Sequence, residues 1–261
     1  MGKQFALFAA ASAIAIALVG TALASHSWGN YHWARSANPL TLDVGDNVDS
    51  RWDAYLDEAI SDWNTSSVLA LSKVGGGTNP TNCRPTSGRI EACNASYGNT
   101  GWLGLAQIWV SGSHIAQAVT KVNDTYFDTT TYNRPEWRRL VMCQEIAHDF
   151  GLAHQDENFS NPNLGSCMDY TSNPLGPPSN EHPNKHDYDQ LATIYGHLDG
   201  SSGGGGGSSG CPGKSKKCRN GLDKAPPFSQ ASRANGDVYV DDVGNGVRRI
   251  THVFWTPFGE Q

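Results

Sequence analysis

Apolar side chains recur at helical spacing in three stretches of the chain. In residues 50–64 the apolar positions would share one face of a helix, and they are Trp52, Tyr55, Leu56, Ile60 and Trp63. A second helix is predicted from Pro135, since proline is favoured in the first helical turn, to Phe150, where Gly151 ends the pattern. A third is predicted over 186–198. The expected helices therefore all precede residue 200.

Short runs rich in β-branched and aliphatic residues predict strands at 40–44, 68–74, 105–110 and 115–122. A segment rich in Gly, Pro and Asn, 75–101, separates the second strand from the third. Strands dominate the first part of this region and helices the second, an order that is typical of an α+β domain.

A run of Gly and Ser residues divides the chain. Such a segment cannot pack a core and behaves as a tether, so we predict a linker at 199–210. It separates a main domain, 25–198, from a short tail, 211–261. Within the tail, two β-prone runs flank Gly244-Asn245-Gly246, which predicts a β-hairpin.

An apolar run at 5–24 follows Lys3 and ends in Ala22-Leu23-Ala24, with small residues where a signal peptidase cleaves. These features predict a secretory signal peptide, 1–24, rather than an uncleaved anchor. We therefore expect a secreted, extracellular protein without stable membrane insertion once the signal is removed.

The six cysteines are consistent with export, because an even number in a secreted chain indicates disulfides. Short sequence separation favours two local pairs and leaves a third: Cys83–Cys93, Cys211–Cys218 and Cys143–Cys167. The last of these would tie the predicted helix 135–150 to the segment around Cys167.

Composition and charge exclude two classes of protein. The net charge of −6 argues against a nucleic-acid partner, and the aromatic content of 10% argues against a disordered chain. Acidic side chains outnumber basic ones in 25–210, whereas the reverse holds in 211–261. We expect a monomer with two differently charged parts.

Candidate chemistry concentrates in the second half of the predicted helix 135–150. Residues four apart share a helix face, so Gln144 and His148 lie together, with Glu145 between them in projection. Gly151 can adopt positive φ and turn the chain so that His154 returns to the same point. Three ligands can then meet one metal ion beside a free carboxylate, which is the arrangement of a catalytic zinc site.

This pattern resembles the metzincin zinc endopeptidases, whose signature H-E-x-x-H-x-x-G-x-x-H is followed by a Met-turn. The Met-turn match is Ser166-Cys167-Met168-Asp169-Tyr170, and it is similar to those of matrixins and pappalysins. The resemblance covers about 25–198 and is stronger to secreted bacterial members than to animal ones. It implies a two-lobed catalytic domain with a mixed twisted sheet, an active-site helix and a C-terminal helix.

The resemblance also implies roles for individual residues. His148 and His154 would bind Zn²⁺, and Glu145 would take a proton from the metal-bound water and pass it to the leaving amine. Met168 would lie beneath the metal and Tyr170 would steady the oxyanion. The implied activity is hydrolysis of peptide bonds in a protein or peptide substrate.

The first ligand position departs from the family, because it holds Gln144 instead of histidine. An amide oxygen is a weaker zinc ligand than an imidazole nitrogen. Three alternatives follow: Gln144 binds zinc through its carbonyl oxygen, another residue such as Asp156 or His114 replaces it, or the site is degenerate. In the last case the chain is a weak or inactive pseudoprotease that binds peptides or proteins outside the cell.

The family places an exposed strand at the upper rim of the cleft, where it pairs with extended substrate. In this chain that strand is 105–110, so Gln107, Ile108 and Trp109 would shape the subsites. No cysteine precedes Cys83, so a cysteine-type latency switch is not expected.

Other titratable residues receive weaker interpretations. Asp156, Glu157 and Asp169 are candidates for calcium, although no calcium site is assigned. Asp149 is expected to face solvent from the helix. His32 has no histidine or carboxylate at metal-ligand spacing, so no role is assigned to it.

Overall fold

The computed structural model describes residues 26–200 and 231–259. The predicted signal peptide, most of the predicted linker and the Cys211–Cys218 pair lie outside these residues. The principal helices are α1 (Asp53–Trp63), α2 (Asp124–Phe127), α3 (Pro135–His148) and α4 (Lys185–Ile194). Within the described ranges, no helix is long and apolar enough to cross a membrane.

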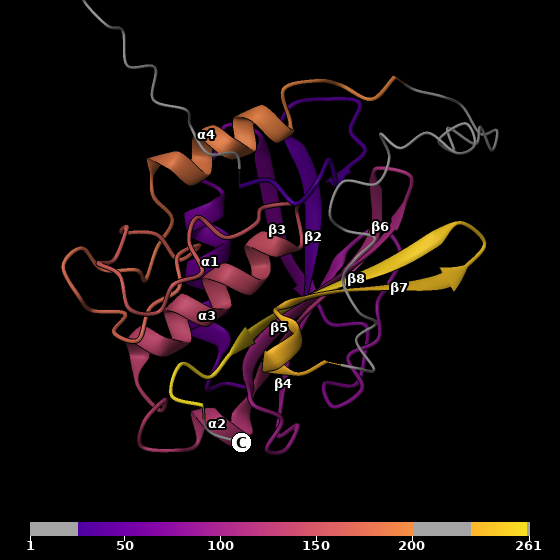
Figure 1. The fold of residues 1–261 in the computed structure, drawn as a ribbon. Coiled ribbons are helices and arrows are strands. Elements are labelled where there is room, and N and C mark those ends of the chain that lie inside the picture. Colours follow the sequence, from indigo (N-terminus) through magenta and orange to yellow (C-terminus); the bar gives the residue numbers. More distant parts are fainter. Residues whose placement is uncertain (1–25, 201–230, 260–261) are drawn as a thin grey trace, which may run out of the picture.

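The strands form one mixed sheet. They are β1 (His32–Trp33), β2 (Leu40–Asn47), β3 (Leu69–Gly75), β4 (Ile90–Ala95), β5 (Trp102–Ser111), β6 (His114–Asn123), β7 (Val238–Gly244) and β8 (Val247–Trp255). Their order is β3-β2-β4-β6-β5-β8-β7, with β1 paired to β6 outside this path. The predicted α+β class, with its mixed sheet, helices and C-terminal hairpin, is confirmed (Figure 1).

Pairing changes direction across the sheet. β2, β3, β4 and β6 run parallel to one another, whereas β5 is antiparallel to β6 and also to β8. Strand β4 lies inside 75–101, which the sequence pattern left without a strand. Every residue of β4 except Ala95 is buried, and this short run lacks the period-2 alternation that marks a half-exposed strand.

The tail hairpin extends the main sheet. β7 and β8 pair with each other, and β8 pairs with β5 from Trp102 to Ser111 (Figure 1). The expectation that 105–110 offers a free edge to substrate is therefore wrong, because β8 takes up the main-chain hydrogen bonds of that edge. Gln107 is buried and donates a hydrogen bond from Nε2 to Thr251 Oγ1 at 2.9 Å, while Ile108 belongs to the core.

The end of α3 is held in place by packing and by a glycine. Trp63 of α1 donates a hydrogen bond from Nε1 to the Cys143 carbonyl oxygen at 3.0 Å, and Cys143 forms a disulfide with Cys167. Beyond the helix, Gly151 has φ +99°, and a Cβ there would clash with the carbonyl oxygen of Tyr31. The chain therefore turns sharply just after α3. Of the two predicted local disulfides, Cys83–Cys93 is also present.

Candidate metal centre

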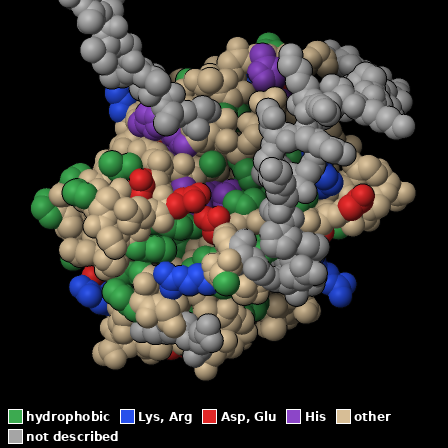
Figure 2. All heavy atoms as spheres, viewed as in Figure 1, with side chains coloured by type: hydrophobic (Ala, Val, Ile, Leu, Met, Phe, Trp, Pro, Cys, Tyr) green, Lys and Arg blue, Asp and Glu red, His purple; other side chains and the backbone are tan. Residues whose placement is uncertain are grey.

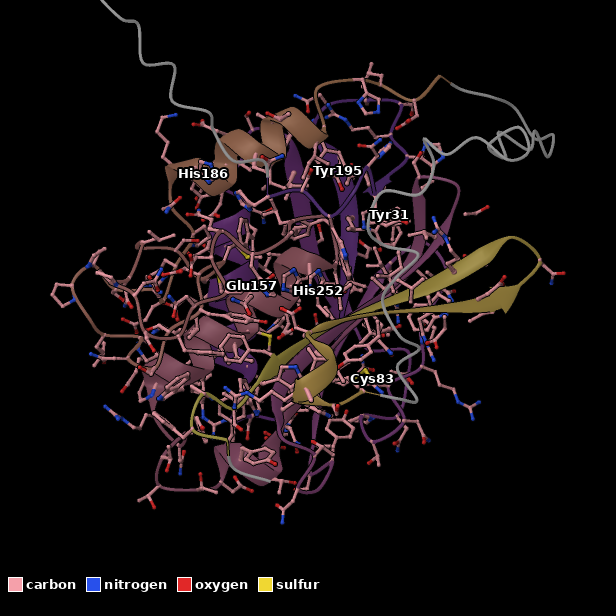
Figure 3. All side chains as sticks on the ribbon, viewed as in Figure 1. Tyr31, Cys83, Glu157, His186, Tyr195 and His252 are labelled. Carbon is pink, nitrogen blue, oxygen red and sulfur yellow. A yellow bond between two sulfur atoms is a disulfide. The ribbon has the colours of Figure 1, made fainter. Side chains whose placement is uncertain are left out.

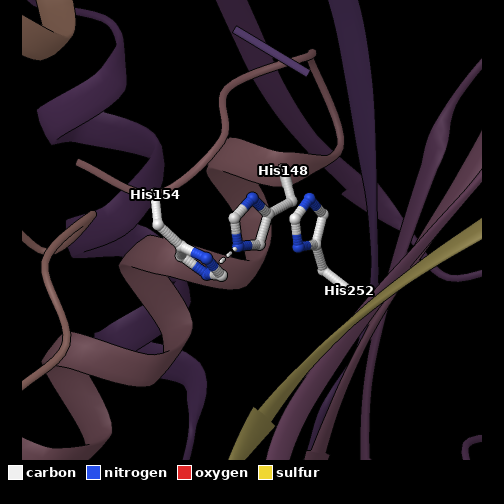
Figure 4. A group of neighbouring side chains, drawn as sticks. All are labelled: His148, His154 and His252. Atoms are coloured by element: carbon white, nitrogen blue, oxygen red, sulfur yellow. Dashed lines mark hydrogen bonds between the residues drawn. The ribbon is translucent and has the colours of Figure 1, made fainter. Parts of the chain in front are cut away.

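His148 and His154 face each other across the turn that follows α3. His148 is fully buried, and its Nδ1 donates a hydrogen bond to the Leu152 carbonyl oxygen at 2.7 Å. The Nε2 atoms of His148 and His154 are 3.0 Å apart (Figure 4). The turn at Gly151 thus returns His154 to the last turn of the helix, as the sequence spacing predicted.

Carboxylates hold the other ring nitrogen of His154. Its Nδ1 lies 3.3 Å from Glu157 Oε1 and 3.5 Å from Asp237 Oδ2. A histidine whose Nδ1 donates to an oxygen presents a bare Nε2 lone pair, which is the usual geometry of a metal ligand. His148 and His154 are both oriented in this way.

A third imidazole, that of His252 on β8, completes the group. It stacks on His148 with ring centroids 4.0 Å apart and an interplanar angle of 8°. His252 is 2% exposed, and neither of its ring nitrogens has a hydrogen-bond partner within the described part of the chain. One nitrogen from each of the three histidines lies within 4.8 Å of the others (Figure 4).

In their neutral forms, these rings make contacts that are unfavourable unless something lies between them. With both Nδ1 atoms used as donors, the Nε2 atoms of neutral His148 and His154 present lone pairs to each other at 3.0 Å. A buried polar atom without a partner also carries a free-energy penalty, and His252 has two. A bound divalent cation would remove the lone-pair contact and would occupy one of the two nitrogens of His252, and imidazole suits zinc and other late transition metals. The residues present therefore fit a metal ion.

Glu145 lies fully buried on α3, one turn before His148. Neither carboxylate oxygen has a hydrogen-bond partner among the described residues, and the side chain packs against Gly104 of β5, where a Cβ would come within 2.8 Å of Oε1. Burial, with a smaller contribution from the charge of Asp149, raises the pKa of Glu145 well above its ordinary value. Such a carboxyl has the raised proton affinity that a general base and acid needs.

Asp149 does not face solvent as predicted. It is fully buried beneath the sheet and accepts a hydrogen bond from Thr120 Oγ1 at 2.8 Å. The helix reaches the sheet at this point, so even the polar side of its last turn is covered. Burial raises the pKa of Asp149 well above its ordinary value.

Gln144 is fully buried, and its Nε2 donates a hydrogen bond to the Cys167 carbonyl oxygen at 2.6 Å. Its Oε1 has no partner within 26–200 or 231–259. The amide thus links α3 to the Met-turn match. Whether Gln144 also binds metal stays a prediction.

Met168 and Tyr170 lie on the segment that the Cys143–Cys167 disulfide ties to α3. Met168 is fully buried, and the ring of Tyr170 lies 4.3 Å from that of His154 between centroids. The Tyr170 hydroxyl donates a hydrogen bond to Asp237 Oδ2 at 2.9 Å. Burial, and then the nearby charge of Asp237, raise the pKa of Tyr170 well above its ordinary value.

Neither replacement ligand suggested by the sequence joins this centre. His114 lies beside His32 and Asp199 at the start of β6. Asp156 bridges to Asp169 through the backbone, and its side chain accepts a hydrogen bond from the Asn158 N–H at 2.6 Å. Sequence reasoning missed His252 because it lies far downstream, in a strand of the predicted hairpin. Its only signal was a histidine inside the β-prone run 247–255.

The centre approaches the surface through the acidic residues next to His154. Glu157 is exposed, and acidic side chains gather beside histidine near the middle of the face shown in Figure 2. Glu157 and His252 both lie near the middle of the molecule in Figure 3. Two cavities border other parts of the structure, and neither is lined by His148, His154 or Glu145. His148, His154 and His252 are all buried, so the metal centre is covered.

Comparison with known proteins reveals only distant likenesses. No protein-family model and no curated protein matches the sequence. Among solved structures, myroilysin is similar with a TM-score of 0.38 and 13% identity over 66% of this chain and 98% of its own. High choriolytic enzyme 1, a hatching-enzyme zinc protease from the medaka fish Oryzias latipes, has a TM-score of 0.34 and 12% identity over 63% and 94%. Neither likeness assigns a family or an activity.

Proposed function

We propose that this chain is a secreted zinc-dependent endopeptidase in which His148, His154 and His252 bind the metal ion and Glu145 acts as general base. The observation that supports this most is the meeting of three buried imidazoles with two inward Nε2 lone pairs, one helical turn from a buried, unpartnered carboxyl. A histidine that only fills space in the core does not need to converge with two others beside a buried carboxyl.

When bound, zinc acts as a Lewis acid that activates water and polarises a carbonyl group. Glu145 holds the proton removed from the attacking water and delivers it to the leaving amine nitrogen, for which its raised pKa is suited. Tyr170 places a phenolic hydroxyl beside His154, where it would donate a hydrogen bond to the substrate oxygen after leaving Asp237.

His252 takes the place of the ligand that the motif lacks at position 144. Its strand pairs with β5 so that His252 lies opposite Ala106, and Phe254 lies opposite Gly104. Residues two apart in a strand share a face, so His252 shares a face with Gly104, the residue that contacts Glu145. The tail hairpin is thereby a part of the metal centre.

The apolar segment 5–24 supports the proposed secretion, and the two disulfides within the described residues suit an oxidising compartment. The substrate would be an extended peptide. Because β8 covers the β5 edge, peptide would approach from the side of His154 and Glu157.

Metal analysis tests the ligand set. We expect His148→Ala and His252→Ala each to lose one equivalent of zinc relative to the wild-type mature chain, measured by elemental analysis after dialysis. His182→Ala is the matched control, because His182 is exposed and contacts Asp62 on the surface. Unchanged zinc content in His252→Ala would show that the tail supplies no ligand.

Cleavage tests the activity. With casein as substrate, Glu145→Gln should retain zinc and lose at least about 100-fold in rate, since a positioned general base contributes on this scale. Equal cleavage by the wild type and Glu145→Gln would contradict the assignment. Full zinc content without any cleavage would favour the alternative function, an extracellular peptide-binding module with an inactive centre.

A further inference from the structure

We infer that His32, His114, His197 and Asp199 form a second metal site, which holds a structural zinc ion. The four side chains come from three parts of the chain. His32 lies on β1 and His114 begins β6, where the two residues are register partners. His197 and Asp199 follow α4 and are separated by Leu198.

Four of the six pairs of ligand atoms lie near the spacing that a tetrahedral ion requires. Zinc bonds of 2.0–2.2 Å place tetrahedral ligands about 3.3 Å from one another. Asp199 Oδ1 is 3.0 Å from His114 Nε2, 3.3 Å from His32 Nε2 and 3.6 Å from His197 Nε2. The Nε2 atoms of His32 and His197 are 3.3 Å apart. One ligand atom from each of His32, His114 and Asp199 lies within 4.8 Å of the other two, and His197 Nε2 adjoins His32 and Asp199.

The neighbouring contacts orient these atoms as ligands. His32 donates a hydrogen bond from Nδ1 to the Asn30 carbonyl oxygen at 2.7 Å, which leaves a lone pair on Nε2 in the neutral ring. Asp199 accepts a hydrogen bond at Oδ2 from the Arg35 N–H at 2.8 Å, so its Oδ1 is the oxygen that faces the histidines. His32 is itself buried.

In their neutral forms these histidines direct lone pairs into the same volume. With its proton on Nδ1, neutral His32 cannot donate to Asp199 from Nε2, although these atoms are 3.3 Å apart. The Nε2 atom of His197 faces the Nε2 lone pair of His32 at 3.3 Å. A cation among the four atoms turns these lone-pair contacts into coordination, and imidazole with carboxylate is a zinc ligand set.

A structural role follows from the number of protein ligands. Structural zinc sites are closed by four protein ligands, whereas catalytic sites keep an open position. This site joins β1, β6 and the segment after α4, and it lies where the main domain meets the Gly/Ser run. The ion would therefore fasten both ends of the main domain to its sheet.

The two sites share no residue, so they can be tested separately in the mature full-length chain. We expect two equivalents of zinc in the wild type. Asp199→Asn and His197→Ala should each retain one, and His148→Ala should also retain one but lose it when combined with Asp199→Asn. His182→Ala should keep both. His197 is 55% exposed at its side chain, so its replacement leaves the core intact.

Stability supplies a second readout. Added zinc should raise the thermal midpoint of His148→Ala, which keeps the second site, more than that of His148→Ala/Asp199→Asn, because a ligand that binds only the folded state stabilises it. Equal zinc content in the wild type, Asp199→Asn and His197→Ala would overturn the site. Equal midpoint shifts in the two His148 variants would also overturn it, and neither result would bear on the centre at His148.

Discussion

At the scale of single residues, the metal centre depends on which nitrogen each histidine presents. Leu152 and the carboxylates of Glu157 and Asp237 occupy the Nδ1 atoms of His148 and His154, and this fixes both Nε2 atoms inward. The turn that makes this possible requires Gly151. A residue without any titratable group therefore controls the positions of two ligands.

Replacing Gly151 tests this dependence. We expect Gly151→Ala to destabilise the protein by more than the 1–2 kcal/mol or so that positive φ alone costs, because its Cβ also meets the Tyr31 carbonyl. Zinc affinity should fall with it, since His154 moves. Denaturant unfolding and zinc titration measure the two effects.

Gly88→Ala is the matched control for that substitution. Gly88 also has positive φ, at +82°, but a Cβ there has nothing within 4 Å. It should show the cost of the backbone conformation alone and leave zinc affinity unchanged. Equal losses of stability and metal in both variants would contradict the steric argument.

At the scale of elements, the C-terminal hairpin adds two strands to the main sheet and contributes to the metal centre. β8 satisfies the edge of β5 and brings His252 to the metal centre, and Asp237, just before β7, contacts His154 and Tyr170. Phe254 packs its ring 5.0 Å from that of Tyr170. Sequence alone places this hairpin in a separate tail, whereas its contacts belong to the metal centre.

Cutting the chain between the two parts tests that role. With a protease site inserted in the Gly/Ser segment 201–210, we expect the cleaved tail to stay bound and to co-elute with the main domain on size-exclusion chromatography. Chelation should weaken this association, because His252 then loses its shared ion. Immediate separation of the fragments in the presence of zinc would show that these contacts do not hold β8 to the main domain.

At the scale of the whole molecule, a polar network helps to join the segment just before α1 to α2 and the turn that follows it. Arg51 contacts Asp49 at 2.8 Å, Asp124 at 3.0 Å and Asp128 at 2.7 Å. Its hydrogen bond, with a further one from Asn94, lowers the pKa of Asp49 to about 2 from an ordinary value of 3.8. The unfolded chain therefore takes up this proton at a higher pH than the folded one.

Acid titration of stability tests the network. Because the folded-state pKa is depressed, Asp49 stabilises the fold fully above pH 3.8 and loses this contribution as pH falls towards about 2. Wild type should exceed Asp49→Asn in free energy of unfolding by under about 1 kcal/mol at neutral pH, since the pair is half exposed. The difference should shrink below pH 3.8; a constant difference down to pH 2 would contradict the assignment.

The amino-acid sequence by itself determined the local features of this protein. The periodicity of 50–64, the proline at 135 and the glycine at 151 specified the helices and the turn, because these depend on neighbours along the chain. The i, i+3 and i, i+6 spacing from Glu145 and His148 likewise predicted which side chains meet after α3.

Only the tertiary structure decided what arrives from far away in the chain. His252 reaches His148 through strand pairing, and His32 reaches His114 and Asp199 through a two-residue strand and the segment after α4. Sequence spacing carries no information about such contacts, because sheet register is set by packing across the fold. The same reason explains the covered β5 edge, which the family resemblance assigned to substrate, and the buried Asp149, which was expected to face solvent.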